Sequence, residues 1–531
     1  MLLKILKPLR VFVSLAFFLL ILFTFVDFAA IFSVKMIQGL LYLQFFPSLL
    51  KFIDVLTLST AGFVMVLLLT FLFGRIYCSS VCPLGTLQDL AIGLKTRLKR
   101  KKKPRYQKPR PILHYTILGV LTAILFIFQN IFFINLLDPY SLAGKIFNNL
   151  FRPVYLLANN LLARGFQAFD NYWLYSVPVK IISVASFVFS VLVFMVLILL
   201  AFFRDRWYCN NICPLGGILR PISKISLFRL QISESRCTLC GSCVKTCKAG
   251  CIDLKNKNIE FERCVACFNC IGACPEGGIG YRMHECTNAD RESQIADHGS
   301  QITDESRRKF LKTTVIGTAG VAGLLTAKGA MASGEKTEST YPVMPPGSVS
   351  YWHYTANCTA CHLCVSVCPT HVLQPSLFKF GLSGIFQPEM DFNTNYCNFD
   401  CVRCGEVCPS GAIFPREKED KQRIQIGYSV FVKNICVVVE KKTACGACSE
   451  HCPTKAVEMV PYLDNLKIPR VDSKICIGCG ACQHACPTKP QKAIFVESNL
   501  YHHTAPKPLK KVEETKPLPG SGKKTEEDFP F

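Results

Sequence analysis

The stretch C-T-A-C-H-L-C-V-S-V-C-P at residues 358–369 carries four cysteines in the spacing Cys-x2-Cys-x2-Cys-x3-Cys-Pro. In bacterial ferredoxins, three thiolates of such a run lie on one tight loop and hold one 4Fe–4S cluster, while the fourth thiolate reaches the neighbouring cluster. The spacing therefore predicts a pair of adjacent clusters rather than one isolated metal ion.

Five more blocks of this kind lie along the chain, so we expect six 4Fe–4S clusters in all. Blocks four and five depart from the standard spacing, and Lys248 replaces the usual proline after block one. The six blocks are Cys237, Cys240, Cys243 and Cys247; Cys264, Cys267, Cys270 and Cys274; Cys358, Cys361, Cys364 and Cys368; Cys397, Cys401, Cys404 and Cys408; Cys436, Cys445, Cys448 and Cys452; and Cys476, Cys479, Cys482 and Cys486.

Two other readings of the cysteines are less consistent with their arrangement. A disulfide scaffold is typical of short secreted chains and does not repeat this spacing. Cys358-x2-Cys361-His362 also matches the attachment motif of a c-type haem, but Cys364 and Cys368 continue the ferredoxin run. Of the 30 cysteines, only Cys251 and Cys286 belong to no motif.

The N-terminal part of the chain is predicted to cross a membrane. Four apolar stretches are long enough to span a bilayer as helices, and basic segments lie at one side of them. The predicted spans are about 11–33, 55–77, 112–136 and 180–203. The basic loop at 95–110 then lies in the cytoplasm, and the outside loop at 137–179 is expected to carry an interfacial helix.

This membrane part contains an internal duplication. The second and fourth spans end in related sequences, Gly74-Arg75-Ile-Tyr-Cys78-x3-Cys82-Pro-Leu-Gly and Arg206-Trp-Tyr-Cys209-x3-Cys213-Pro-Leu-Gly. Two related helical hairpins would bring Cys78, Cys82, Cys209 and Cys213 together on the cytoplasmic side. These four thiols could hold a seventh metal centre, iron–sulfur or another metal, or could work as redox thiols.

The formal net charge of +23 suggests nucleic-acid binding, but its distribution argues against that partner. The basic residues concentrate at 95–110, where they are the ordinary anchor of a membrane protein. Each cluster with its four thiolates also adds negative charge that the formal count omits.

The remaining segments complete a multi-domain protein with a helical membrane domain and ferredoxin-like α+β domains. An Arg307-Arg308 pair before an apolar segment that ends in Ala330-Met331-Ala332 is typical of a twin-arginine export signal. We predict a membrane domain at 1–220, a cytoplasmic dicluster domain at 231–286, a linker at 287–305, the export signal or a fifth span at 306–333, a periplasmic four-cluster domain at 341–499 and a disordered tail at 500–531.

On these motifs, residues 1–285 resemble the NapH-type membrane iron–sulfur subunit of periplasmic nitrate reduction, and residues 306–499 resemble its NapG-type partner. The related NosR-type and CcoG-type proteins share the membrane motifs. The resemblance implies a quinol dehydrogenase of the inner membrane that feeds a periplasmic reductase. It also implies nested pairing in the exported domain, in which block three pairs with block six and block four with block five. In the cytoplasmic domain, the two blocks are expected to exchange their fourth ligands. Cys274 would complete the cluster of Cys237, Cys240 and Cys243, and Cys247 would complete that of Cys264, Cys267 and Cys270.

Quinol oxidation needs a proton acceptor, for which Asp27 and Asp138 are the catalytic candidates. They occupy equivalent positions of the duplication near the outer face, where an ionisable side chain indicates function. The alternative is that they cap helix ends or pair with Lys35 and Lys145. The sequence leaves open whether the cytoplasmic clusters take part, so a conduit from a cytosolic donor and a maturation reductase for a partner metalloprotein remain alternatives.

Overall fold

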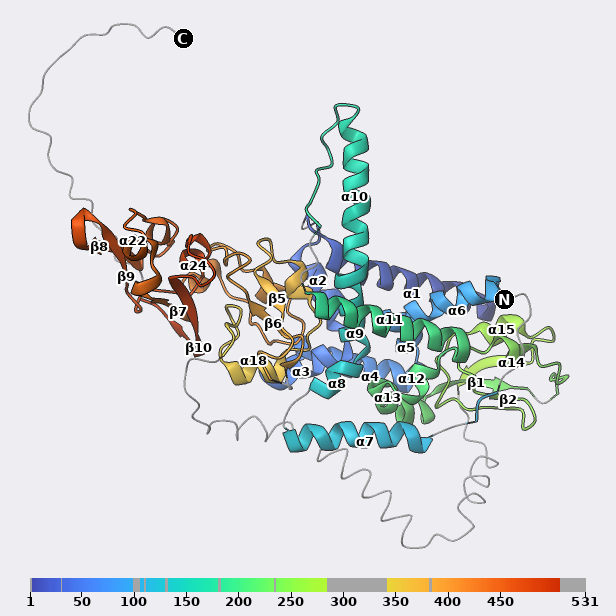
Figure 1. The fold of residues 1–531 in the computed structure, drawn as a ribbon. Helices are drawn as coiled ribbons and strands as arrows, with labels where there is room; N and C mark the ends of the chain where they lie inside the picture. The colour runs from blue at the N-terminus through green and yellow to red at the C-terminus, as the bar shows by residue number, and fades with distance from the viewer. Residues whose placement is uncertain are drawn as a thin grey trace, which may run out of the picture.

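Three regions lie in a row along the long axis of the molecule (Figure 1). The computed structural model describes residues 2–29, 31–98, 106–108, 111–128, 132–179, 183–233, 235–283, 341–381 and 384–506. The helical N-terminal part is in the middle, one small iron–sulfur domain is at one end, and the C-terminal domain is at the other. The linker predicted at 287–305 and the export signal predicted at 306–333 lie outside the described residues.

The helical part contains helices of very different lengths. They are α1 Leu2–Val26, α2 Val34–Tyr42, α3 Phe45–Val55, η1 Leu58–Thr60, α4 Gly62–Phe73, α5 Tyr77–Ser80, α6 Pro83–Leu98, α7 Pro111–Phe128, α8 Phe132–Leu137, α9 Pro139–Ile146, the π-helix η2 Phe147–Phe151, α10 Arg152–Gln167, α11 Val184–Arg204, α12 Trp207–Asn211 and α13 Pro214–Lys224. α1 and α11 both run in the long direction of the molecule, and both contact α6 (Figure 1).

The four predicted spans are not all found as membrane-crossing helices. Two described helical segments are long and apolar enough to cross a bilayer, Ile5–Val26 and Val184–Arg204. A third span is possible if α2 and α3, which meet at an angle of 103°, count as one broken helix. The longest helix in the stretch 55–77 is the 12-residue α4, which follows η1 and ends at Gly74, whose φ is +75°. A helix of this length covers about 18 Å, short of the roughly 30 Å hydrocarbon core.

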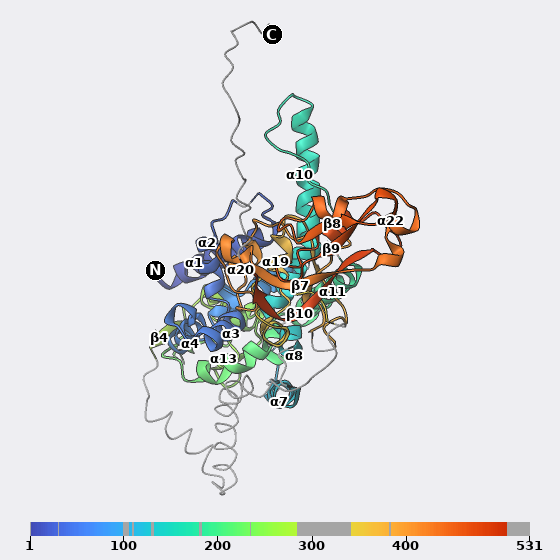
Figure 2. The same ribbon diagram turned by 90° about the vertical axis from the view of Figure 1, so that its left-hand side faces the viewer.

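The segment 137–179, predicted to be an outside loop, carries the expected helix. α10 stands across the direction of α1 and α11 and projects away from the other helices in both views (Figures 1 and 2). Large apolar side chains are exposed along α10 and the turn after it, namely Val154, Leu157, Leu161, Leu162, Phe169 and Trp173. A helix at right angles to the spans with an exposed apolar surface is the arrangement of an interfacial helix.

The small domain that follows α13 has a ferredoxin-like topology. Its elements are β1 Phe228–Ile232, α14 Ser242–Thr246, β2 Ile252–Asp253, β3 Asn258–Ile259, α15 Asn269–Ala273 and β4 Ile279–Met283. The first strand pairs with the last, in the register Leu230 opposite Tyr281, and β2 pairs with β3 between the two cysteine blocks. Each short helix follows a cysteine loop.

The C-terminal domain is a longer array of cysteine loops with small antiparallel sheets. Its elements are α18 Tyr351–Asn357, α19 Leu363–Ser366, β5 Leu373–Pro375, β6 Pro388–Met390, α20 Arg403–Glu406, α21 Lys418–Lys421, β7 Ile424–Phe431, η5 Lys433–Ile435, α22 Val437–Glu440, α23 Ala447–Glu450, β8 Val457–Pro461, η6 Leu463–Asn465, β9 Lys467–Val471, α24 Ala481–Ala485 and β10 Ile494–Thr504. Because β10 continues past residue 499 to pair with β7, the ordered domain reaches into the predicted tail.

The helical part and the C-terminal domain share one apolar core. Cys361, Leu363 and Val407 of the C-terminal domain belong to the same buried cluster as Phe25 and Tyr140 of the helices. The backbones touch closely, since a Cβ atom on Gly144 of α9 would lie 2.4 Å from the Cys361 carbonyl oxygen. The two regions are therefore packed together over the first cysteine loop of the C-terminal domain.

Candidate functional site: thiol groups and the cavity between them

The cysteine loops of blocks one, two, three and six share an unusual backbone. In each loop, the residues on both sides of the second cysteine have positive φ. These pairs are Leu239 and Gly241, Ala266 and Phe268, Ala360 and His362, and Gly478 and Gly480. Such left-handed turns aim successive backbone N–H groups into a concavity that suits an anionic group. In blocks four and five the residues flanking the equivalent cysteine have negative φ, which agrees with their altered spacing.

In the small domain, the thiols of the two blocks meet as exchange of the fourth cysteine requires. Cys243 interacts electrostatically with Cys240 and with Cys274 of the other block. Cys270 interacts with Cys264 and Cys267, and also with Cys247 from the first block. This grouping matches the one expected from the sequence. The unassigned Cys251 lies beside it, with its Sγ atom 3.7 Å from that of Cys247.

In the C-terminal domain, the first two thiol groups combine blocks three and four. Group A consists of Cys358, Cys361, Cys364 and Cys408, whose thiols interact electrostatically. Group B consists of Cys368, Cys397, Cys401 and Cys404, which line one small cavity.

The other two groups combine blocks five and six. Group C consists of Cys452, Cys476, Cys479 and Cys482. Group D consists of Cys436, Cys445, Cys448 and Cys486, which again line one cavity. Four cysteines around a common space, as in groups B and D, suit a 4Fe–4S cluster.

The nested pairing of block three with block six is therefore wrong. The reason lies in the sheets, because β7 before block five pairs with β10 after block six, while β8 and β9 pair between them. This is the same arrangement as β1 with β4 and β2 with β3 in the small domain. Each sequential pair of blocks thus forms its own dicluster unit.

The four groups follow one another from the helices to the far end of the molecule. Asn135 of α8 donates a hydrogen bond to the Cys358 carbonyl of group A, 3.3 Å away. Groups A and B touch through Cys364 and Cys404, and groups B and C through the 2.9 Å hydrogen bond from the Cys397 N–H to the Cys479 carbonyl. Cys448 of group D interacts with Cys482 of group C. The order is therefore A, B, C, D.

His362 has no role that resembles a haem ligand. Its ring is buried, and its Nε2 atom lies 2.9 Å from the Phe386 carbonyl, to which it donates a hydrogen bond. Its neighbours Cys358 and Cys361 belong to group A. The geometry thus favours the ferredoxin reading of this motif.

The duplicated motifs come together as the sequence predicts. Thiols of both halves interact electrostatically, Cys82 with Cys209 and Cys213 with Cys78. We call Cys78, Cys82, Cys209 and Cys213 the paired-motif site. Its two halves have the same local packing, because a Cβ on Gly85 or Gly216 would lie 2.2 Å from the Cys78 or the Cys209 carbonyl oxygen, respectively. Only glycine fits at these two positions.

Two buried arginines interlock the halves. Arg206 of the second half donates to the Cys78 carbonyl of the first, at 2.6 Å, and its Nη1 lies 4.0 Å from the Cys209 sulfur. Arg75 of the first half donates to Asn210 of the second and to the Arg263 carbonyl of the small domain. The sequence contained this signal, since both arginines stand three residues before the first cysteine of their motif, but their role was not predicted.

A buried carboxylate connects the paired-motif site to the small domain. Asp89 of α6 forms ion pairs with Arg10, Arg206 and Lys248, at 2.9, 2.8 and 3.1 Å. Burial acts to raise the pKa of Asp89, but the three cations outweigh burial and hold the pKa below its usual value. Lys248 follows Cys247, so its unexpected place after block one is explained by this contact.

The spacing of the cysteine thiols bears on whether they could hold a single metal ion or a cluster. Among the described residues, no group of three or more His, Cys, Asp or Glu side chains is arranged to hold a single metal ion. The corners of a cubane hold its thiolates farther apart than the ligands of one ion, so this finding does not count against clusters.

Asp138 lies between the paired-motif site and group A. It is 1% exposed, and its carboxylate caps α9 by accepting hydrogen bonds from the Ser141 N–H and hydroxyl, at 2.8 and 2.7 Å. Burial raises the pKa of Asp138 to about 6. The two hydrogen bonds with Ser141 are those of the helix-capping alternative. Asp138 also interacts electrostatically with Tyr77 and Tyr208, which adjoin the paired motifs.

Lys145 is a buried cation at the same junction. It interacts with Cys358 and Cys361 of group A, and its ammonium lies 5.5 Å from the centre of the Phe189 ring. Burial lowers its pKa to about 8, while the thiolates and Asp138 act in the opposite direction. Lys145 interacts electrostatically with Asp138, its predicted partner. Its positive charge would also stabilise an added electron on a cluster at group A.

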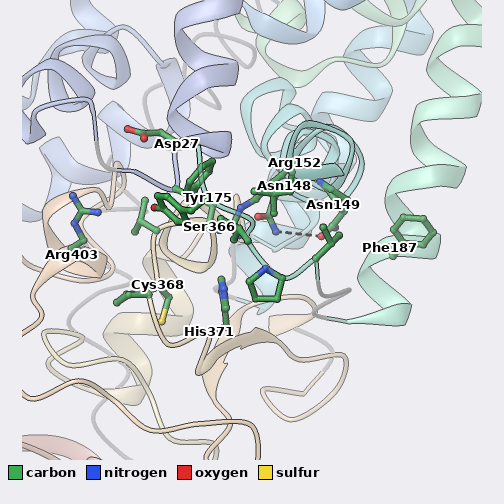
Figure 3. A pocket seen from close by; sticks show the side chains of 18 residues that line it. Asp27, Asn148, Asn149, Arg152, Tyr175, Phe187, Ser366, Cys368, His371 and Arg403 are labelled. Carbon is green, nitrogen blue, oxygen red and sulfur yellow. Dashed lines mark hydrogen bonds between the residues drawn. The ribbon is translucent and has the colours of Figure 1, made fainter. Parts of the chain in front are cut away.

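Asp27 borders a cavity of about 220 Å³ between the helices and the C-terminal domain. Figure 3 shows Cys368 and His371 on one side of this cavity and Arg152, Asn148 and Asn149 on the other. Asp27 accepts a hydrogen bond from the Phe32 N–H with one carboxylate oxygen, at 3.0 Å. Its pairing with Lys35 is not among the ion pairs of the described residues.

Three residues that line the cavity each have a buried polar atom without a partner among the described residues. Asp27 Oδ1, Asn148 Oδ1 and Arg152 Nε are buried and make no hydrogen bond with the described residues. Leaving one such atom unpaired costs about 1–3 kcal/mol. Water or a polar ligand in the cavity is therefore favoured, next to Cys368 of group B.

Comparison with known protein families agrees with this chemistry. Residues 55–103 and 186–233, which contain the two paired motifs, match a family described as a 4Fe-4S binding domain, and residues 230–253 match another family of that description. Residues 357–427 and 443–489 match families described as 4Fe-4S dicluster domains. The first of these matches contains blocks three and four, and the second contains block six and all of block five except Cys436.

Individual relatives are ferredoxin-type proteins of low identity. The ferredoxin-type protein NapF of Escherichia coli (strain K12) is 27% identical over 148 residues, 28% of this chain and 80% of NapF. The methylamine utilization ferredoxin-type protein MauN of Methylobacillus flagellatus is 27% identical over 191 residues, 36% of this chain and 54% of MauN. The putative electron transport protein YccM of Escherichia coli (strain K12) is 27% identical over 183 residues, 34% of this chain and 43% of YccM. No solved structure matches the chain.

Taken with the thiol groups, these relatives define the class. The chain is a multi-domain iron–sulfur electron-transfer protein with ferredoxin-type 4Fe–4S domains.

Proposed function

We propose that the protein oxidises a membrane quinol at the cavity beside Asp27 and delivers the electrons through groups B, C and D to a separate reductase. This corresponds to a fused NapH-type and NapG-type arrangement. The observation that carries the proposal is that one cavity is bordered both by Asp27 of the helical part and by Cys368 of group B.

The residues of the cavity match the chemistry of a quinol. Its oxidation to quinone releases two electrons and two protons. Asp27 Oδ1 and Asn148 Oδ1 can accept hydrogen bonds from the quinol hydroxyls, and Arg152 Nε can donate to a quinone carbonyl. A carboxylate in contact with the hydroxyl is a suitable general base. The 4Fe–4S clusters, when bound at the thiol groups, supply one-electron carriers.

The cavity also has an apolar approach for a lipid-soluble substrate. Val154 and Leu157 of α10, on either side of the lining residue Leu156, are 64% and 58% exposed. An interfacial helix would hold these side chains at the level of the lipid headgroups, where a quinol ring can enter.

Replacing Asp27 with Asn tests the proton acceptor. The amide keeps the size of the side chain but cannot take a proton, so reduction of the bound clusters by menadiol should slow by about 10²–10⁴-fold. Reduction by dithionite should stay normal, because Asp27 belongs to no thiol group. The measurement is the bleaching of cluster absorbance in stopped flow.

Asp138→Asn is the matched control, because Asp138 is also an aspartate at the outer end of its hairpin but does not line this cavity. Asn is as good a helix cap as Asp, so the fold should be kept. Equal menadiol rates in wild type and Asp27→Asn would contradict the proposal. An equal decrease of the menadiol reduction rate in both variants would show that Asp27 is not the specific proton acceptor.

The proposal includes a location in the inner membrane with the C-terminal domain in the periplasm. It is supported by the two apolar helices and by the opposite ends that the two iron–sulfur domains occupy (Figure 1). Export of a folded domain is read from an arginine pair, here Arg307-Arg308.

The double substitution Arg307→Lys/Arg308→Lys should leave the C-terminal domain in the cytoplasm. A tag at the C-terminus would then be protected when protease is added to spheroplasts, whereas the wild-type tag is digested. Lys312→Arg, which leaves the pair intact, should behave as wild type. Digestion of the tag in the double variant would overturn the proposed orientation.

A second candidate function is a conduit from a cytosolic donor, and the buried contacts of the paired-motif site favour it. Lys248 beside Cys247 reaches Asp89, Asp89 binds Arg206, and Arg206 contacts both halves of the paired-motif site. On the other side, Tyr208 and Asp138 lead towards Lys145 and group A. This continuous series of buried contacts would let the small domain supply electrons.

A further inference from the structure

A second, larger cavity of about 570 Å³ lies between the helical part and the C-terminal domain. Its helical wall comes from α2, α3 and η1, the outer loop of the first hairpin, whereas the cavity beside Asp27 is formed largely by the outer loop of the second hairpin. Its lining includes Leu41, Tyr42, Lys51, Val55, Phe414 and Arg416.

The walls on the side of the C-terminal domain are equivalent in the two cavities. Val367-Cys368-Pro369 borders the first cavity, and Val407-Cys408-Pro409 borders the second. Each tripeptide contains the last cysteine of its block. Because Cys368 belongs to group B and Cys408 to group A, each cavity touches a different member of the first dicluster unit.

The lining of the second cavity offers hydrogen-bond donors and apolar surface. Lys51 and Arg416 are cations that can donate to a carbonyl oxygen, and Leu41 and Val55 supply apolar surface. Phe414 of the lining stacks on His353, with ring centres 5.0 Å apart. The Nε2 atom of His353 lies 3.5 Å from Asp54 Oδ2, so an acid–base pair adjoins the lining residue Phe414 without lining the cavity itself.

The position of this acid–base pair has a simple steric explanation. Three residues after its cysteine, the first cavity has His371, whereas the second has Gly411. A Cβ atom on Gly411 would lie 3.6 Å from Asp54 Oδ2 and from Lys51 Cγ. Asp54 and Lys51 of α3 therefore lie directly against Gly411, where a side chain as large as that of His371 would meet them.

Apolar side chains next to the second cavity are exposed, including the lining residue Val55. Val55 and Leu56 at the end of α3 are 41% and 66% exposed. α2 and α3 form the pair of apolar helices bent by 103°, and broken helices of this kind line binding sites in membrane proteins. An isoprenoid tail could leave the cavity across Val55 and Leu56 into lipid.

We propose that this second cavity is another quinone-binding site, so that the protein has one site beside group A and one beside group B. The inference rests on the proposed function and extends it. Oxidation of a quinol there would release two electrons to the 4Fe–4S clusters and two protons, one of which the His353–Asp54 pair can accept while the other passes to solvent. The two halves of the duplicated membrane part would each serve one cluster.

Titration with the quinol analogue 2-heptyl-4-hydroxyquinoline N-oxide, whose fluorescence is quenched on binding, tests the proposal on the full chain loaded with clusters. Wild type should bind two equivalents. Ser59→Trp fills the rim of the second cavity and should leave one, as should Val179→Trp in the first cavity. The double variant should bind none, and Thr96→Trp, exposed at the far end of α6, should still bind two.

Lys51→Met guards against a folding artefact, because it keeps the side-chain volume and removes one charged donor. It should weaken one of the two sites about tenfold or more, with unchanged iron content. One equivalent in wild type, unaffected by Ser59→Trp and Lys51→Met, would overturn the second site and leave the proposed function intact. No binding in wild type would overturn both.

Discussion

Full-length protein loaded with iron and sulfide under anaerobic conditions is expected to contain about 28 iron atoms per chain, four for each of seven thiol groups. The double variant Cys78→Ser/Cys209→Ser should contain about 24, because it removes one thiol from each half of the paired-motif site and leaves the six blocks intact. Iron and acid-labile sulfide, measured per chain, give both numbers.

The reason for expecting a seventh cluster is the agreement of two findings. The four thiols interact with one another, and both halves match a family described as a 4Fe-4S binding domain. Cys286→Ser, which removes a cysteine outside every motif, is the control and should keep about 28 iron atoms. Equal iron in wild type and the double variant would mean that the paired-motif site holds no cluster.

The same double variant separates the two candidate functions. If quinol is the donor at the cavity beside Asp27, menadiol should still reduce groups A to D, because Cys368 of group B touches that cavity directly. If electrons come from the small domain, they must pass the paired-motif site. In that case groups A to D should no longer be reduced in the variant. Menadiol reduction that depends on Cys78 and Cys209 would therefore favour the conduit.

The sequence was most informative where function depends on local spacing. The cysteine blocks, the duplicated motifs and the helix in the outside loop all have local signals, and the structure brings the corresponding residues together. Tertiary contacts were harder to foresee. The pairing of blocks depends on which strands join, so β7 with β10 decides it rather than the cysteines themselves.

Two other differences have equally physical reasons. Apolar composition suggested a span at 55–77, but Gly74 ends α4 and Arg75 turns inward to bind Asn210 and Arg263. The cavities could not be predicted, because each is formed by segments more than 200 residues apart in the chain, such as Asp27 and Cys368. A carboxylate near the end of a helix suggested function, yet only the folded chain distinguishes Asp27 from Asp138.

The order of the thiol groups leads to the other large effect that we expect. Cys401→Ala/Cys404→Ala removes two thiols of group B, the only one of the four groups whose contacts reach both A and C. Menadiol should then fail to reduce groups C and D, whereas group A should remain reducible at the second cavity, which Cys408 of group A borders. Electron paramagnetic resonance of samples frozen at successive times distinguishes the groups by their spectra and by the spin count.

The matched variant is Cys445→Ala/Cys448→Ala, which makes the same two substitutions in group D at the far end of the molecule. Because group D follows group C, menadiol should still reduce A, B and C in this variant. The group D variant should lose one reduced-cluster signal, and the group B variant should lose three. This difference would establish that electrons move from the helical part outwards to group D. Full reduction of group C in the absence of group B would contradict the linear order and require a second point of electron entry.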